Sequence, residues 1–223
     1  MKIAIVVFPG TNREGDVRAA FVAAGVGSNS LQQVWHRESQ IPSGTDLIVL
    51  PGGFSYGDYL RCGAMAARSP IMREVKAAAG RGVAVLGICN GFQILCESGL
   101  LPGVLLCNRG LKFVCREVEL EVASNRSIYT RKVSVGHRLR APVAHHDGNY
   151  FAESPVLAEL EQQDRIVFRY AEHDNPNGSA LNIAGITDPS RRVLGLMPHL
   201  ENAIDPHAGG TAGRLMFDSI LSG

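Results

Sequence analysis

Three apolar segments, each followed by a turn, constrain the fold of this chain more than any other feature. KIAIVVF at 2–8, DLIVL at 46–50 and VAVLGI at 83–88 show no alternation of polar and apolar residues. Runs of this kind are typical of strands that are covered on both faces, as in parallel sheets. The residues at 13–24 and 70–79 have helical spacing, and helices between parallel strands form right-handed crossovers. We therefore predict an α/β fold with a mostly parallel central sheet flanked by helices.

The second half of the chain has a different pattern. KFVCREVELEV at 112–122 alternates polar and apolar residues, and the segments 133–144 and 165–171 also indicate strands. Alternation is typical of antiparallel strands with one covered face. We expect these antiparallel strands to be added to the parallel core, and a final helix at 208–221. A length of 223 residues, without a linker or an internal repeat, favours a single domain over 1–223.

The composition disfavours several classes of protein. A formal net charge of +1 does not suit a surface for nucleic acid or an anionic membrane. Five cysteines, an odd number without a CxxC pair, argue against a disulfide scaffold and a structural zinc site. The N-terminal run lacks the features of a secretory signal, and no segment approaches the roughly 20 apolar residues of a transmembrane helix. We expect a cytoplasmic protein with reduced thiols.

The strongest functional motif surrounds Cys89, in VAVLGICNGFQIL. A G-x-C-x-G turn between a strand and a helix, here predicted at 91–97, is a cysteine form of the nucleophile elbow. The helix N-terminus would favour the thiolate, and the Asn90 N–H would face an oxyanion. The alternative is a buried packing cysteine, the usual role of a free cysteine. We assign that packing role to the remaining cysteines, Cys62, Cys96, Cys107 and Cys115.

A second motif, MPHLE at 197–201, follows another apolar run. His199 and Glu201 are two residues apart, so they lie on one side of an extended chain. The carboxylate can then hold one imidazole nitrogen and leave the other facing a thiol. This predicts a Cys–His–Glu relay if His199 meets Cys89 in the fold. The alternative is a loop histidine beside a solvated carboxylate.

A glycine-rich turn, PGGFSYGD at 51–58, follows the second apolar run. Gly52 and Gly53 allow the backbone to approach a ligand, so that its N–H groups can stabilise developing negative charge. A phosphate-binding loop is disfavoured, because neither GK[ST] nor GxGxxG is present. An ordinary turn at the end of a strand is the other alternative.

Two adjacent histidines, His145 and His146, raise the question of a metal site. Zinc takes three or four protein ligands, and no third ligand with suitable spacing follows these histidines. We therefore predict no metal site, with both histidines solvated or on the substrate side.

Together, these motifs resemble the class I, or triad, glutamine amidotransferases, which have a flavodoxin-like sheet. The likeness is strongest to the glutaminase subunits of phosphoribosylformylglycinamidine synthase, an ATP-dependent C–N ligase of purine biosynthesis. It covers nearly the whole chain, in family order. The blocks that carry it are VVFPGTN at 6–12, VLPGGFSYGDYLRCGAMA at 49–66, LGICNGFQIL at 86–95, LLPGVLLCNRGLKFVCREVELEV at 100–122, APVAHHDGNYF at 141–151, NPNGSALNIAGI at 175–186 and VLGLMPHLENA at 193–203.

The resemblance implies that Cys89, His199 and Glu201 hydrolyse glutamine and that the ammonia passes to an L-type synthase subunit. That partner converts formylglycinamide ribonucleotide to formylglycinamidine ribonucleotide with ATP and Mg²⁺, in a complex that includes a small S-type subunit. The chain has no ATP motif of its own, so we expect no cofactor in it. The resemblance implies that the oxyanion and glutamine site comprises Gly52, Gly53, Asn90, Gln93 and His145.

Some sequence features leave alternatives open. The family usually has MPHPE, and in this chain Leu200 stands in place of the second proline. The family usually has AHGEGN, and in this chain His146 and Asp147 stand in place of the glycine and the glutamate. Gln93 either contacts the substrate or packs within the helix. The aromatic loop 54–64 either contacts the synthase partner or folds over the active site. Two other functions stay open: a cysteine-elbow enzyme of the DJ-1 or intracellular-peptidase kind, and an inactive scaffold that regulates a partner.

Overall fold

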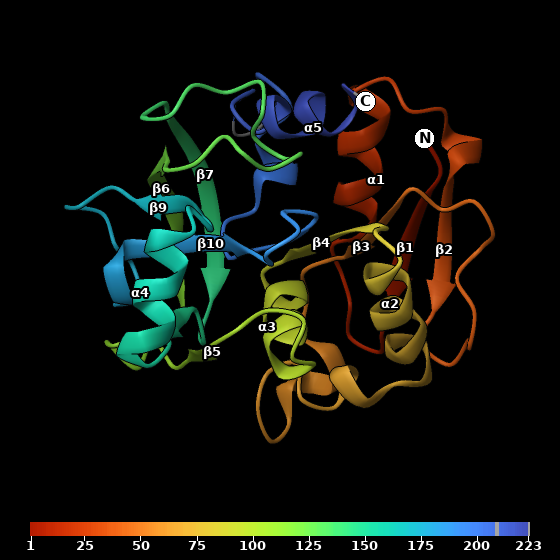
Figure 1. The fold of residues 1–223 in the computed structure, drawn as a ribbon, viewed down its shortest axis with the longest axis horizontal. Coiled ribbons are helices and arrows are strands. Elements are labelled where there is room, and N and C mark those ends of the chain that lie inside the picture. The colour runs from red at the N-terminus through yellow and green to blue at the C-terminus, as the bar shows by residue number, and fades with distance from the viewer. Residues whose placement is uncertain (208–209, 223) are drawn as a thin grey trace.

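One sheet organises the part of the chain that the computed structural model describes, residues 1–207 and 210–222. Within these residues, nine strands follow one another across the sheet (Figure 1). In spatial order they are β2 (Leu31–Trp35), β1 (Ile3–Val7), β3 (Leu47–Leu50), β4 (Ala84–Ile88), β11 (Val193–Leu196), β10 (Ile183–Thr187), β9 (Ile166–Tyr170), β6 (Val114–Val122) and β7 (Arg138–His145). The pairings from β2 to β11 are parallel, and those from β11 to β7 are antiparallel.

The helices of the described residues are α1 (Glu14–Ala23), α2 (Pro70–Gly80), α3 (Asn90–Glu97), α4 (Ser154–Gln162) and α5 (Arg214–Ile220). In Figure 1, α1 and α2 lie beside the parallel strands, and α4 lies beside the antiparallel ones. Helix α3 packs against β3, β4 and β11. Phe21 of α1 meets Phe217 of α5 edge to face, with ring centroids 5.0 Å apart. In the described part of the chain, no helix combines the length and the apolar character needed to cross a bilayer.

Burial follows the sequence patterns. Every residue of β3, β4 and β11 is buried, because helices or loops cover both faces of the parallel half. Along β7, buried residues alternate with more exposed ones, as the sequence of this region predicts. The predicted fold class, a parallel α/β sheet with added antiparallel strands, is thus confirmed.

Several element boundaries differ from the prediction. The strand predicted at 133–144 begins at Arg138, because Gly136 turns the chain with a φ of 82°. The helix predicted at 208–221 begins at Arg214, and residues 208 and 209 lie outside the described residues. Four features were not predicted from the sequence: β2, β10, α4 and a small antiparallel sheet of β5 (Val104–Leu106) and β8 (Asn149–Phe151).

The register of three neighbouring strands positions the candidate site. Leu50 of β3 pairs with Gly87 of β4, and Ile88 of β4 pairs with Leu196 of β11. Because these strands are parallel, their carboxyl ends meet at the same edge of the sheet. The glycine-rich turn after β3, the cysteine after β4 and the histidine after β11 therefore leave the sheet side by side.

Candidate active site

Cys89 occupies the sharp turn between β4 and α3. Its φ of 52° and ψ of −106° form a sparsely populated conformation, which costs of order 1–3 kcal/mol. Glycines on both sides make the turn possible. A Cβ on Gly91 would lie 1.9 Å from the carbonyl oxygen of Leu50, and a Cβ on Gly87 would lie 2.7 Å from the Gly91 oxygen. The turn therefore has the geometry of a nucleophile elbow.

The Cys89 thiol lies at the amino end of α3. Its Sγ is 3.8 Å from the Ala144 carbonyl oxygen, and its backbone N–H donates to the Leu196 carbonyl at 2.8 Å. The first N–H groups of a helix have no partner within the helix, and the helix dipole adds partial positive charge there. Asn90 is the first residue of α3. Its N–H is thus suited to hold an oxyanion formed beside the thiol.

His199 and Glu201 form a buried pair directly after β11. The imidazole Nδ1 lies 2.6 Å from the Glu201 Oε1, which leaves Nε2 for a thiol. Burial alone would lower the pKa of His199, but the charge of Glu201 and the interaction with Cys89 raise this pKa well above its usual range. The second carboxylate oxygen of Glu201 is buried without a hydrogen-bond partner among the described residues. The pair is therefore arranged to stabilise an imidazolium.

The turn that carries this pair tolerates leucine at position 200. Leu200 is fully buried in a 3-10 turn, η5 (Leu200–Asn202). His199 N–H donates to the Pro142 carbonyl of β7 at 2.8 Å. The carbonyl of Leu200 packs so closely on Gly213 that a Cβ there would approach it to 2.0 Å. The leucine thus fills a core position, and the histidine and glutamate after β11 stay in contact.

The glycine-rich turn after β3 forms a wall of the same site. A Cβ on Gly52 would lie 2.8 Å from His199 Cε1 and 3.5 Å from Cys89 Cβ. Histidine and cysteine therefore flank one glycine, and the fold brings them together. Gly53 has a φ of 149° and bridges to Thr11. The turn thus presents backbone rather than side chain to the thiol.

The side chains of Asn90 and Gln93 are engaged by protein groups. Asn90 Oδ1 accepts from the Ser55 N–H at 3.2 Å, and Asn90 Nδ2 donates to Gln93 Oε1 at 2.8 Å. Gln93 Nε2 donates to the Asp147 carbonyl oxygen at 2.7 Å. These bonds connect the loop after β3, the start of α3 and the loop after β7. In this arrangement the Gln93 amide holds the loops together.

His145 is buried in a separate polar network. Its Nδ1 lies 3.1 Å from Asn108 Oδ1, and its Nε2 lies 3.5 Å from Asn177 Nδ2. Burial and the charge of His199 lower the pKa of His145 to about 4, so the ring is neutral. Because protein groups hold both of its nitrogens, this ring fixes the segment that follows β7.

A cavity of about 210 Å³ opens beside Cys89 and His199, and Gly53 lies in its wall. Several residues that line this cavity were not predicted from the sequence. Asn12, Phe113 and Cys115 belong to blocks that carry the family resemblance, so their place in those blocks was the available signal. The lining residues that were missed are Asn12, Arg13, Phe113, Cys115 and Ala144.

Two of the cysteines assigned to packing are exposed, so that assignment was wrong for them. Cys115 lies on β6, where an exposed position places its thiol at the cavity, and Cys107 follows the short strand β5. Cys62 and Cys96 are buried, as predicted.

Comparison with known proteins places the site in a family. Residues 1–211 match the model of the CobB/CobQ-like glutamine amidotransferase domain. The chain is 55% identical to phosphoribosylformylglycinamidine synthase subunit PurQ of Rhodospirillum rubrum, over 99% of this chain and 98% of the relative. It is 54% identical to the same subunit of a Jannaschia species, over 100% of this chain and 98% of the relative.

Solved structures agree with these matches. PurLQS from Thermotoga maritima superposes with a TM-score of 0.88 at 40% identity, over 99% of this chain and 97% of the matched chain. The glutaminase domain of Trypanosoma brucei CTPS, with bound acivicin, has a TM-score of 0.61 at 16% identity, over 99% and 93%, and supports the fold alone. The chain therefore belongs to the CobB/CobQ-like glutamine amidotransferases and, within them, to the PurQ subunits of phosphoribosylformylglycinamidine synthase.

Proposed function

We propose that this chain hydrolyses the side-chain amide of glutamine to glutamate and ammonia, and that a synthase partner consumes the ammonia. One observation carries the proposal: the strained Cys89 and the carboxylate-held His199 flank the same residue, Gly52. A cysteine at a helix N-terminus beside an oriented imidazole is suited to nucleophilic catalysis. Membership of the amidotransferase family selects glutamine as the substrate.

The first half-reaction forms a thioester. His199 accepts the thiol proton, and Cys89 Sγ attacks the amide carbon. The backbone N–H groups of Asn90 and Gly53 stabilise the oxyanion, and one such donor typically lowers the barrier by about 3–4 kcal/mol. His199 then protonates the amide nitrogen, and ammonia leaves. Glu201 holds the imidazole through Nδ1 and stabilises the imidazolium.

The second half-reaction releases glutamate. His199 takes a proton from water, which attacks the thioester carbon, and the Cys89 thiol is regenerated. The cavity beside the thiol is the proposed glutamine site. Arg13 borders this cavity and pairs with Asp16 at 3.0 Å. We assign Arg13 to the α-carboxylate of glutamine, because a guanidinium binds a carboxylate through paired hydrogen bonds.

The proposed partner is the L-type synthase subunit, which converts formylglycinamide ribonucleotide to formylglycinamidine ribonucleotide with ATP and Mg²⁺. A small S-type subunit belongs to the same complex. The similarity to the Thermotoga maritima PurLQS structure supports these partners. Tyr59 and Leu60 are 75% and 93% exposed, in the loop that begins with Phe54 at the cavity. Exposed apolar residues beside a site favour a docking role for this loop.

Two further properties belong to the proposal. The chain forms a single domain over 1–223, because one continuous core joins the parallel and antiparallel halves. We assign the protein to the cytoplasm, because its five cysteines are free and the Cys89 nucleophile must stay reduced to react.

The proposal can be tested by labelling with diazo-oxo-norleucine, a glutamine mimic that alkylates the nucleophile. The complete complex should take up one label per chain, and peptide mass spectrometry should find that label on Cys89. Cys115→Ser is the matched control, because this exposed thiol lines the same cavity and should not contribute. Labelling of Cys115 instead, or no labelling with partners present, would contradict the proposal and favour the inactive scaffold.

A further inference from the structure

A group of sulfur, nitrogen and oxygen ligands lies outside the catalytic relay. One ligand atom each from Cys107, His146 and Asp147 lies within 4.8 Å of the other two. The small sheet of β5 and β8 produces this arrangement, because Leu106 pairs with Asn149 in antiparallel register. The residue after β5 therefore comes to lie beside the residues before β8.

Hydrogen bonds hold the Asp147 carboxylate at the centre of this group. His146 Nδ1 lies 2.6 Å from Asp147 Oδ1, and Cys62 Sγ lies 3.0 Å from Asp147 Oδ2. The carboxylate thus lies between a thiol and an imidazole, and the Cys107 thiol belongs to the same group of ligand atoms. Sulfur, nitrogen and carboxylate oxygen gathered this closely are suited to a cation.

The ligand set also selects the kind of cation. Thiolate, imidazole and carboxylate together suit a borderline metal ion such as Zn²⁺, which prefers tetrahedral coordination. We propose that Cys107, His146 and Asp147 bind a divalent cation of the Zn²⁺ class, with water as the fourth ligand. Cys62 is a positioning residue that orients Asp147 through the other carboxylate oxygen.

This site revises the prediction, made from the sequence, that the chain holds no metal. The sequence showed no third ligand with suitable spacing for His145 and His146, and the β5–β8 register brings Cys107 from a distant segment to His146 and Asp147. His146 and Asp147 are also the residues at which the chain departs from the usual family pattern. The site is therefore expected in this chain and in relatives that share these residues, rather than in the whole family.

A cation at this site would act on the loops beside the nucleophile. The Asp147 carbonyl accepts a hydrogen bond from Gln93, which is bonded in turn to Asn90, the neighbour of Cys89. Fixing Asp147 to a cation would therefore stiffen this connection. We expect Zn²⁺ to raise the melting temperature of the protein, because a ligand that binds only the folded state stabilises it.

Cobalt spectroscopy tests the site without an activity measurement. The titration uses Co²⁺ alone, in a Cys89→Ala background, because the Cys89–His199 pair is itself a candidate ligand for soft metals. We expect one Co²⁺ per chain, with a thiolate-to-cobalt charge-transfer band and intense tetrahedral visible bands. Zn²⁺ should displace Co²⁺ and remove both signals.

Four variants in that background assign the ligands. Cys107→Ser should remove the charge-transfer band. His146→Ala, at a half-exposed side chain that is not part of the core, should weaken binding by about 100-fold. Cys62→Ser should keep the band and weaken binding by about 10-fold. Cys115→Ser is the matched control, an exposed cysteine elsewhere, and should change nothing.

Three results would overturn the proposal. They are the absence of a charge-transfer band in the Cys89→Ala protein, a band that survives Cys107→Ser, and unchanged affinity in His146→Ala. Circular dichroism of each variant without metal verifies that it folds. His146→Ala keeps the proposal open to refutation even if Cys107→Ser fails to fold.

Discussion

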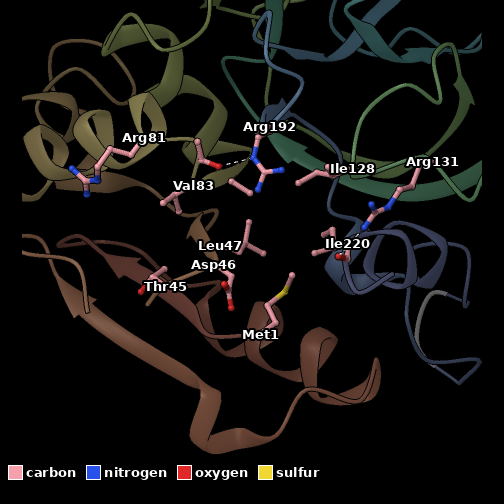
Figure 2. Close-up of a pocket in the computed structure, with 12 residues that line it drawn as sticks. Met1, Thr45, Asp46, Leu47, Arg81, Val83, Ile128, Arg131, Arg192 and Ile220 are labelled. Atoms are coloured by element: carbon pink, nitrogen blue, oxygen red, sulfur yellow. Dashed lines mark hydrogen bonds between the residues drawn. The ribbon is translucent and has the colours of Figure 1, made fainter. Parts of the chain in front are cut away.

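The two ends of strands β3, β4 and β11 carry different chemistry. At their carboxyl ends, Cys89 and His199 border a cavity of about 210 Å³. At their amino ends, a larger cavity of about 350 Å³ is bordered by Asp46, Arg81 and Arg192 (Figure 2). Size alone would favour the amino-end cavity. The nucleophile and base nevertheless lie at the other end, where parallel α/β sheets carry their sites.

The difference lies in how the polar groups are used. At the amino ends, Arg192 Nε donates to the Gly82 carbonyl at 2.6 Å, as Figure 2 shows, and Arg81 pairs with Glu74 at 2.6 Å. These contacts hold chain segments together. At the carboxyl ends, a strained cysteine borders the cavity, and the buried carboxylate behind His199 keeps one oxygen without a hydrogen-bond partner among the described residues. Strain and incomplete pairing, rather than volume, distinguish the active end.

The largest expected effect separates the two ends by activity. Cys89→Ala should lower glutaminase activity by about 10⁴-fold or more, because no other group forms the thioester. Synthesis from added ammonia should persist in the reconstituted complex, since the partner does not need this thiol. The matched change at the amino end, Arg192→Ala, should keep nearly full glutaminase activity. Similar losses in both variants would remove the distinction between the ends.

The next effect concerns the carboxylate behind the base. Glu201→Gln should lower kcat/KM for glutamine by about 10²–10³-fold, because the imidazolium loses its counter-charge. The same change should lower the pKa of His199, which Glu201 raises in the folded protein. The pH dependence of Cys89 alkylation by iodoacetamide measures this second effect. Glu74→Gln, at the ion pair near the amino ends, is the control, and a Glu201→Gln profile equal to it would contradict the relay.

A smaller effect is expected from one methyl group. Gly52→Ala places a Cβ 2.8 Å from His199 Cε1, so the imidazole must shift. A displacement of this size should lower kcat by up to about 10²-fold with little change in KM. Gly80→Ala is the matched control, because a Cβ there has open space within 4 Å. Steady-state kinetics of both variants test this, and normal kcat in Gly52→Ala would show that the site has room to adjust.

The sequence predicted the parallel half of the fold better than its margins. Buried strands such as β3 and β4 are continuous apolar runs, which can be recognised in the sequence alone. Strand β2 reads LQQVW, with both glutamines exposed at the edge of the sheet, and its pattern is too mixed to recognise. The short β5 and β8 depend on pairing with each other, so neither segment indicates a strand alone.

The same limit applies to the site. Cys89, His199 and Glu201 were predictable, because each follows a recognisable strand and has a residue type that fits its role. Arg13, which directly precedes α1, reaches the cavity only in the folded chain. The contact between Asn108 and His145 likewise arises only on folding. These contacts depend on strand register and loop path, which local sequence does not encode.

The smallest expected effect is a loss of stability at acid pH. It should appear first near the carboxyl ends of β3, β4 and β11. Burial and the charge of His199 lower the pKa of His145 from 6.5 to about 4. Between these values the unfolded state binds more protons, so the free energy of unfolding falls as pH drops through this window. The buried ring should lower the free energy of unfolding by about 2 kcal/mol at pH 5, and this loss should be nearly absent at pH 7.

His145→Asn isolates this term, because asparagine can still donate to Asn108 but does not titrate in this range. Urea unfolding at pH 7 and pH 5 should show the wild type losing about 2 kcal/mol more than the variant, because only the wild type must keep a neutral imidazole buried. Parallel pH dependence in the two proteins would refute the buried neutral ring. Amide hydrogen exchange identifies the residues that lose stability. Residues 144–148 should lose protection at pH 5, whereas 82–85, at the amino ends and without a histidine, should not.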